Sequence, residues 1–424
     1  MNRKEQFIVS SVRLSASQKF FLFVVFFLVV FPKGGVTLGD IPFTWSYALL
    51  ALAGMLLLPL NIGGFFSGIG SLRFGLIAGF PLYAGLLLWA NGSYSFGLGL
   101  AFFVSSVGMP LLLFIFGPVF LLKVPPLVLT RYLRWLLGFV SAYGLLAFVL
   151  HNYFSITLFV PYLTTGVVQV EDLMTKHNMR GEVSKLISTY NNGNIFGVCL
   201  LILLPLADVG RTARSWMYVL LTRSALIFTL SRTVWVGLIL YELLSAGYVR
   251  KVRAGFALLV ILIGGGITAV FMGVLTIAGY DSSFLIDTTM GGRLGVDSIP
   301  VAIEWVSDQP FGGIREIVYM GVAESFGIIG LLLFIPHFFA PWLIVLFSGH
   351  RPNTPLAKSC LLSVLIYNIL SLSDGAYLLI PVAAFYWFMA GYLYVAMNLT
   401  ITHPAYGNRG YIRQSAQETG GENS

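Results

Sequence analysis

The four arginines Arg180, Arg232, Arg293 and Arg315 are the residues of this sequence whose chemistry stands out most. A guanidinium group is planar, stays charged near a membrane and donates paired hydrogen bonds to phosphate oxygens. If the four converge, we expect them to bind an anionic headgroup, and a diphosphate carried on a lipid is the obvious candidate. The alternative is that they are solvated loop charges paired with nearby acids. The acids available are Glu171, Asp172, Asp297 and Asp308.

The composition defines the setting in which these arginines lie. Of the 424 residues, 57% are hydrophobic and 10% are charged, and the mean hydropathy is +0.87. Such a chain is expected to be a polytopic membrane protein. The first apolar run has no small-residue cleavage site after it, so we interpret it as the first span and not as a signal peptide. Cys199 and Cys360 lie in apolar segments far apart, which indicates neither a disulfide framework nor a metal site.

The hydropathy pattern predicts a single all-α membrane domain over residues 1–424, with about twelve transmembrane helices of roughly 20 residues each. The predicted spans lie near residues 20–32, 44–61, 74–91, 97–121, 133–151, 194–209, 215–230, 233–248, 255–279, 326–348, 359–372 and 376–397. Residues 1–18 and 400–424 are the predicted cytoplasmic tails. Two long external loops are predicted at 152–193 and 280–325.

The distribution of charge predicts the orientation. With a cytoplasmic N-terminus, most of the 25 basic residues fall on the cytoplasmic side, as the positive-inside rule expects. The acids at or near that face are Glu5, Asp208, Glu242, Glu418 and Glu422. The net charge of +8 is therefore mainly an orientation signal, and no basic patch in a soluble domain supports binding of nucleic acid. With this orientation both termini are cytoplasmic and both long loops are external.

Both long loops are polar, and each contains a segment that we expect to be helical. In the first, "EDLMTKHNMRGEVSKLI" has acids early and bases later, which predicts one or two short helices. In the second, a helix is expected from about Ile299 to Val306, with glycine turns around it. No internal repeat is evident.

Two arginines lie in or beside the predicted spans. Arg223 is the deepest, and an arginine at the bilayer centre costs about 2.5–3.5 kcal/mol on insertion scales, so it needs a partner. A structural ion pair or bonds to backbone carbonyls would satisfy it. Arg232, in "TLSRTVWVG", is nearer the outer surface, where its side chain can reach water. Joining the apolar runs on either side of Arg232 into one helix would invert every later loop and place "VRKVR" outside, so we predict a tight outer turn.

Four segments, in order, resemble the bacterial O-antigen polymerase and ligase superfamily. They are "YNNGNIFGVCLLILLPL" (190–206), "TLSRTVWVGLIL" (229–240), "GGRLGVDSIPVAIEWVSDQPFGGI" (291–314) and "VAESFGIIG" (322–330). They resemble, respectively, an Asn-rich entry to a span, a Ser-Arg element at the outer end of a span, an outer-loop pattern of Arg, Trp, Pro and Gly, and a Glu-x-x-Gly entry to the next span. The first 150 residues match only as hydrophobic spans.

The resemblance implies an inverting glycosyltransferase that acts outside the membrane on glycans linked to undecaprenyl diphosphate, without a metal or other cofactor. Arg232 and Arg293 are then the first candidates to stabilise the charge that develops on the diphosphate leaving group. Expected partners are membrane lipids, a chain-length regulator and a flippase.

One position departs from the ligase pattern. The His-Asn pair that ligases carry ahead of the Glu-x-x-Gly segment falls here on Arg315 and Glu316. A chain without that His resembles a polymerase more than a ligase, and Glu316 becomes a candidate general base. The alternative for Glu316 is a salt bridge with Arg315 or Arg293. Both a ligase and a lipid-linked glycan flippase stay open as functions.

The other expected substrate-binding residues each have a structural alternative. Asn191 and Asn194 are candidates to bind sugar or phosphate, but capping of the sixth span explains asparagine there as readily. Trp305 is a candidate to stack on a sugar. Glu324 is a candidate ligand, although a carboxylate at the outer end of a span is often a helix N-terminal charge. His337, within a span, is expected to be a buried packing residue.

Overall fold

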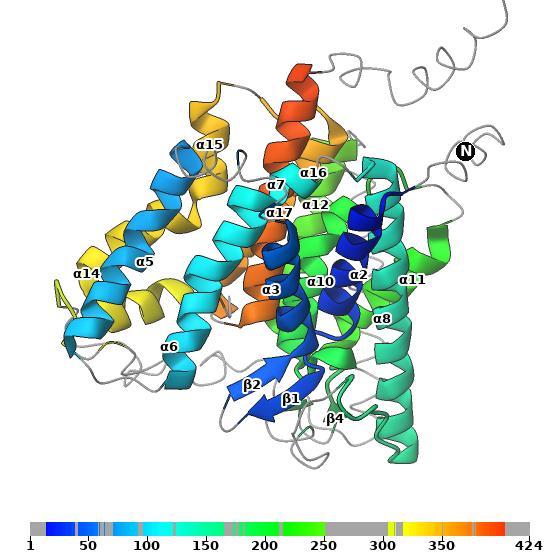
Figure 1. Ribbon diagram of the computed structural model, residues 1–424. Helices are drawn as coiled ribbons and strands as arrows, with labels where there is room; N and C mark the ends of the chain where they lie inside the picture. Colours follow the sequence, from blue (N-terminus) through cyan, green and yellow to red (C-terminus); the bar gives the residue numbers. More distant parts are fainter. Residues whose placement is uncertain are drawn as a thin grey trace, which may run out of the picture.

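The computed structural model describes most of the chain outside residues 251–303. The described residues are 14–38, 41–57, 59, 63, 71–91, 96–121, 124–164, 173, 178–180, 183–211, 215–250, 304–308, 310, 317–349, 351–374, 377 and 379–402. Within these ranges the structure is mostly helical (Figure 1).

The helices follow one another with short connections in the described ranges. The α-helices are α2 (Ala16–Val30), α3 (Trp45–Leu57), α5 (Leu72–Asn91), α6 (Phe96–Phe103), α7 (Gly117–Leu121), α8 (Pro126–Phe154), α10 (Gly193–Ala207), α11 (Trp216–Phe228), α12 (Arg232–Leu244), α14 (Val318–Phe338), α15 (Ala340–Phe347), α16 (Pro355–Asp374) and α17 (Ile380–Thr402). Three π-helical segments, η2 (Val104–Gly108), η3 (Pro110–Phe116) and η7 (Ser245–Arg250), and one 3₁₀ turn, η5 (Ser188–Tyr190), complete the helical elements.

Five of the described helical segments are long and apolar enough to cross a membrane. They are Leu72–Asn91, Gly99–Phe116, Pro126–Phe154, Val318–Phe338 and Pro355–Ser373, and further apolar helices are shorter. The chain is thus a helical protein built to be embedded in a membrane. The total of about twelve spans stays a prediction, and the predicted span at 255–279 lies outside the described residues.

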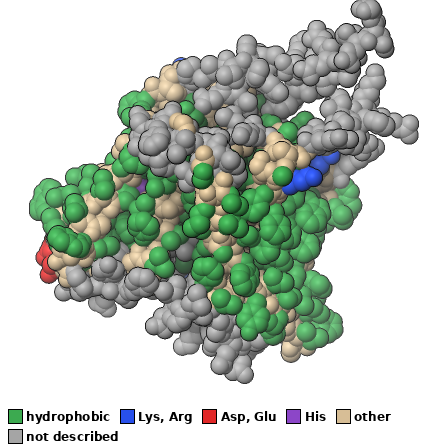
Figure 2. All heavy atoms as spheres, viewed as in Figure 1, with side chains coloured by type: hydrophobic (Ala, Val, Ile, Leu, Met, Phe, Trp, Pro, Cys, Tyr) green, Lys and Arg blue, Asp and Glu red, His purple; other side chains and the backbone are tan. Residues whose placement is uncertain are grey.

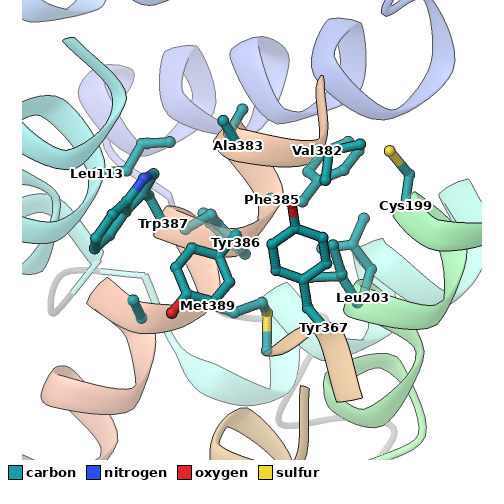
Figure 3. Packing of buried hydrophobic residues seen from close by; sticks show 14 of the residues in the cluster. Leu113, Cys199, Leu203, Tyr367, Val382, Ala383, Phe385, Tyr386, Trp387 and Met389 are labelled. Carbon is teal, nitrogen blue, oxygen red and sulfur yellow. The ribbon is translucent and has the colours of Figure 1, made fainter. Parts of the chain in front are cut away.

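The centre of the bundle is formed by α10, α16 and α17. Every residue of α10 except Asn194 is buried, which is typical of a helix that is apolar on all sides. On α17, the large rings of Tyr386 and Trp387 are fully buried (Figure 3). A Cβ atom on Gly197 would lie 2.3 Å from Val234 Cγ2, so this glycine lets α12 pack directly against α10.

The outer surface of the bundle is apolar, unlike that of a water-soluble protein. Trp89 on α5 is 82% exposed, and Trp135 on α8 and Trp216 on α11 are 58% and 66% exposed. Figure 2 shows apolar side chains over most of the described surface on one face. An extended apolar surface of this kind marks contact with another apolar phase, and for a polytopic chain that phase is lipid.

Two short β-hairpins correct the all-α prediction. The strand β1 (Gly35–Leu38) pairs antiparallel with β2 (Ile41–Thr44), and β3 (Met179–Arg180) pairs with β4 (Val183–Ser184). The second hairpin lies within 171–187, where the sequence predicted one or two short helices, so that prediction is wrong for residues 179, 180 and 183–187, whereas Leu173 is helical. The charge pattern that we took for helix ends says nothing about strand pairing, which satisfies backbone groups equally well.

The helix α14 begins earlier than predicted and is broken in its middle. Residues Val318–Ser325, assigned to the second external loop, are helical, whereas the predicted helix ending at Val306 is absent over Glu304–Val306. Gly327 has φ +73° and ψ −176°, and the two parts of α14 run in different directions from it (Figure 1). The N–H groups of Ile328 and Ile329, freed by the break, donate to the carbonyls of Glu304 at 3.0 Å and Trp305 at 3.2 Å.

We predict that Gly327→Ala destabilises the protein. The positive φ is unfavourable for a residue with a Cβ atom, and that atom would lie 2.5 Å from the Trp305 carbonyl oxygen. The cost is expected to be at least about 1–3 kcal/mol. Thermal unfolding of the purified protein in nanodiscs measures it. The matched control is Gly75→Ala in α5, where no atom lies within 4 Å of the added Cβ atom, and equal unfolding temperatures for the two variants would contradict the prediction.

Candidate functional site at one end of the bundle

Arg232 is the first residue of α12, directly after a tight turn from α11. The turn is short because Leu230 adopts a left-handed φ of +50° and its N–H donates to the Ile227 carbonyl at 3.2 Å. The indole Nε1 of Trp235 donates to the same carbonyl at 2.9 Å. The prediction that two separate helices meet here is confirmed, and Arg232 is half-buried at their junction.

The end of the first predicted external loop packs against this turn. The N–H of Leu186 donates to the Phe228 carbonyl at 2.9 Å. A Cβ atom on Gly193, the first residue of α10, would lie 3.1 Å from Lys185 Cβ and 3.2 Å from the Thr229 carbonyl oxygen. Lys185 is 4% exposed, so the fold brings a second basic residue close to the turn before Arg232.

Asparagines build the entry to α10. The side-chain Oδ1 of Asn192 accepts hydrogen bonds from the N–H groups of Asn194 at 2.9 Å and Ile195 at 3.2 Å. Asn191 has φ +59°, and its carbonyl accepts from Asn178 Nδ2 at 2.8 Å. Capping is therefore confirmed as the role of Asn192. Asn191 forms the turn before the helix, and Asn194 lies half-buried in its first turn.

A small hollow with a mixed apolar and polar lining lies between the end of α8 and the segment that precedes α10. Its volume is about 20 Å³, and His151, Lys185 and Asn191 are among the residues that line it. The Nδ1 atom of His151 is 3.2 Å from the hydroxyl of Thr157. The neighbouring Asn152 makes two hydrogen bonds with Ser184. Its Oδ1 accepts from the Ser184 N–H at 2.9 Å, and its Nδ2 donates to Ser184 Oγ at 2.8 Å.

Hydrogen bonds join α2 and α3 to the same end of the bundle. The hydroxyl of Tyr190 donates to the Val29 carbonyl at 2.8 Å, and burial raises the pKa of this phenol well above its usual value, so it stays a donor. Trp45 Nε1 donates to the Tyr162 carbonyl at 2.7 Å. Figure 1 shows β1, β2 and β4 together at this end. The loops around Arg232 therefore form one packed layer.

The remaining predicted site residues lie in several places. Arg180 is half-buried in β3, Trp305 is 67% exposed beside the break in α14, and Glu324 lies inside α14, three residues before Gly327. Glu324 is therefore not at the start of a helix. Arg293, Arg315 and Glu316 lie outside the described residues, so the convergence of the four arginines stays a prediction.

Arg223 is held by two carboxylates. Its Nη2 atom is 2.6 Å from Asp208 Oδ2 and 2.9 Å from Glu242 Oε1, and its Nε donates to the same Glu242 oxygen at 3.0 Å. Tyr241 donates its hydroxyl hydrogen to Asp208 Oδ2 at 2.5 Å. The structural ion pair expected as one explanation of this deep arginine is confirmed. We call Asp208, Arg223, Tyr241 and Glu242 the ion-pair cluster, and it joins α10, α11 and α12.

The surroundings of His337 define its role. His337 is fully buried, with Nδ1 2.8 Å from the Ile77 carbonyl oxygen and Nε2 2.7 Å from the Tyr377 hydroxyl, so it is the packing residue that the sequence predicted. Within the described ranges, no group of three His, Cys, Asp or Glu residues is arranged to hold a metal ion.

Comparisons with models of known protein families, with curated proteins and with solved structures find no match to this chain. The class of the protein is therefore defined by its fold and by the residues at the two ends of α10. It is a membrane-embedded helical protein with a polar layer containing Arg232, Lys185 and His151 at one end. At the other end, about 22 Å away along the 15 residues of α10, lies the ion-pair cluster.

We predict that removing Arg223 is far more damaging than removing Arg211, its neighbour on Asp208. The side chains of Arg223, Asp208 and Glu242 are 14%, 5% and 12% exposed, and breaking a buried pair costs about 3–5 kcal/mol. The Nη1 atom of Arg211 lies 3.4 Å from Asp208 Oδ2, and this side chain is 26% exposed. Arg211→Met is therefore expected to lower the free energy of unfolding by about 1 kcal/mol or less.

Urea unfolding of the two variants in detergent micelles measures the difference. The triple variant Arg223→Met, Asp208→Asn, Glu242→Gln is expected to recover part of the loss, because no uncompensated charge stays buried. Equal losses for Arg223→Met and Arg211→Met would contradict the assignment.

Proposed function

We propose that the protein polymerises lipid-linked oligosaccharide repeat units for a bacterial cell-surface polysaccharide such as O-antigen, capsule or exopolysaccharide. In this proposal the growing glycan is transferred from its undecaprenyl diphosphate carrier to the non-reducing end of the next repeat unit. The protein is then a metal-independent inverting glycosyltransferase of the inner membrane, with about twelve spans, cytoplasmic termini and an external active face.

The observation that carries the proposal is the position of Arg232. It begins α12 at a tight turn, half-buried, and Lys185 packs beside the same turn. The N–H groups at the start of a helix favour negative charge, and basic residues there add to this preference. A lipid-embedded protein with such an end suits a substrate that has an apolar tail and an anionic headgroup.

The chemistry requires two kinds of group. A hydroxyl of the acceptor sugar attacks the anomeric carbon of the donor, and the diphosphate departs with the electron pair of the broken bond. Arg232 and Arg293 are proposed to stabilise the charge on the leaving diphosphate. Arg180 and Arg315 would add to the binding of the headgroup. Glu316 is the base that the sequence offers for the hydroxyl proton.

The other predicted residues would bind the glycan. Trp305 presents a largely exposed indole for stacking on a sugar ring, and Glu324, Asn191 and Asn194 offer hydrogen-bond partners. A chain-length regulator and a flippase are proposed as protein partners, since a polymerase of this kind needs units delivered to the external face. A ligase that transfers finished glycan to another acceptor, and a flippase, are the alternatives that the experiment below separates.

We predict that the purified protein, reconstituted in liposomes with undecaprenyl diphosphate-linked repeat units, forms a ladder of longer lipid-linked glycans. Arg232→Ala and Arg293→Ala are each expected to slow elongation about 10²–10³-fold, the usual effect of removing one group that stabilises charge in a transition state. Glu316→Gln tests the base. Lys358→Ala is the matched control, because Lys358 contacts Tyr248 away from this layer, and it should retain the wild-type rate.

The alternatives predict other products. A ligase would transfer glycan to a separate acceptor and make no ladder. A flippase would move the lipid-linked unit across the bilayer without forming a glycosidic bond, and that result would contradict both transferase proposals. Equal rates for Arg232→Ala and Lys358→Ala would contradict the role given to Arg232.

A further inference from the structure

The hollow beside α8 is lined by the imidazole of His151, which has no role in the reaction proposed above. His151 lies in the last turn of α8 and is half-buried, and its Nδ1 atom pairs with the Thr157 hydroxyl. The ring is attached to a rigid element. The N–H groups of Ser155 and Ile156 donate to the His151 and Leu150 carbonyls, both at 3.0 Å, and Ser155 ends the helix in the left-handed conformation of an αL cap.

The size and lining of the hollow fit one hydroxyl group. Its volume is about 20 Å³, and one water-sized group needs at least about 10–15 Å³. Phe148, Leu158 and Ile187 form part of its wall, and Ser184, Lys185 and Asn191 add polar groups. A hydroxyl on an otherwise apolar sugar face fits such a mixed lining next to the imidazole.

The hollow adjoins the turn that precedes Arg232. Lys185 belongs to both places, because it lines the hollow and also packs against Gly193, next to the Thr229 carbonyl. The following residue, Leu186, is hydrogen-bonded to Phe228 at the end of α11. The segment of Lys185 and Leu186 thus lies between the hollow and the turn at the proposed diphosphate site.

We propose that His151, in place of Glu316, is the general base of the glycosyl transfer, a role that rests on the proposed function. The acceptor hydroxyl enters the hollow, and its proton passes to Nε2 while its oxygen forms the new bond to the anomeric carbon. The bond from that carbon to the diphosphate oxygen breaks, and its electron pair leaves with the diphosphate. The proton is later released to water. In the tautomer in which Nδ1–H donates to the Thr157 hydroxyl, Nε2 is the nitrogen that accepts the proton.

The test compares His151→Ala, His151→Asn and Thr157→Val in the elongation assay. A general base contributes about 10²–10⁴-fold, so both His151 variants should lower kcat at least about 10²-fold and change KM little. His151→Asn retains a group that bonds Thr157, which separates catalysis from the fastening of the loop. Thr157→Val removes only the partner of Nδ1 and should lower kcat by a smaller factor. Added imidazole should restore part of the rate of His151→Ala.

Each outcome has a definite meaning. A wild-type rate for His151→Asn, together with slow elongation by Glu316→Gln, would assign the base to Glu316 and overturn this inference alone. Slow elongation by His151→Asn with equal loss in Thr157→Val and no rescue by imidazole would make His151 a structural residue. A wild type that forms no glycosidic bond would overturn the proposed function and this role together. Size-exclusion chromatography of each variant excludes misfolding as the cause.

Discussion

The structure depends on one constraint, which is that backbone N–H and C=O groups in an apolar environment must find partners within the protein. Helices satisfy this constraint along their length, so the backbone groups that need other partners are those at helix ends and breaks. At Gly327 the freed N–H groups are bonded by the carbonyls of Glu304 and Trp305. At Asn192 a side chain serves the same purpose for α10. The break at Gly327 therefore ties residues 304 and 305 to α14, whereas Asn192 caps its own helix.

The charged groups obey the same constraint in a different way. The ion-pair cluster satisfies Arg223 completely within the bundle, with two carboxylates and a tyrosine hydroxyl in one network. It fixes α10, α11 and α12 relative to one another at one end, and the same three helices carry the polar layer at the other. The ion pair of Arg223 and the half-buried Arg232 thus lie at opposite ends of these helices, and the proposed chemistry is placed at the Arg232 end.

The sequence predicted those features that depend on local pattern. Apolar composition indicated the helices, positive-inside counting separated α11 from α12, and the Asn-rich entry to α10 was correctly linked to capping. The hairpins pair residues that are close in sequence, such as Leu38 with Ile41 and Arg180 with Val183, and they were missed because the two residues between each pair were not interpreted as a turn. The early start of α14 was missed because its first residues mix polar and apolar types. No role was predicted for Lys185 or His151, because a single basic residue forms no recognisable spacing pattern. The one available signal for His151 was its position at the end of an apolar run, directly before Asn152.

The central claim is that the layer containing Arg232 faces the outside of the cell, and cysteine labelling tests it most directly. The native Cys199 and Cys360 are fully buried, so they give no background. Tyr162, 57% exposed, lies in the polar layer, whereas the exposed Arg351 lies in the connection between α15 and α16, which the charge pattern places inside. In intact cells, a membrane-impermeant thiol reagent is predicted to label Tyr162→Cys and to label Arg351→Cys only after permeabilisation. The reverse pattern would contradict the external active face and the transfer reaction built on it.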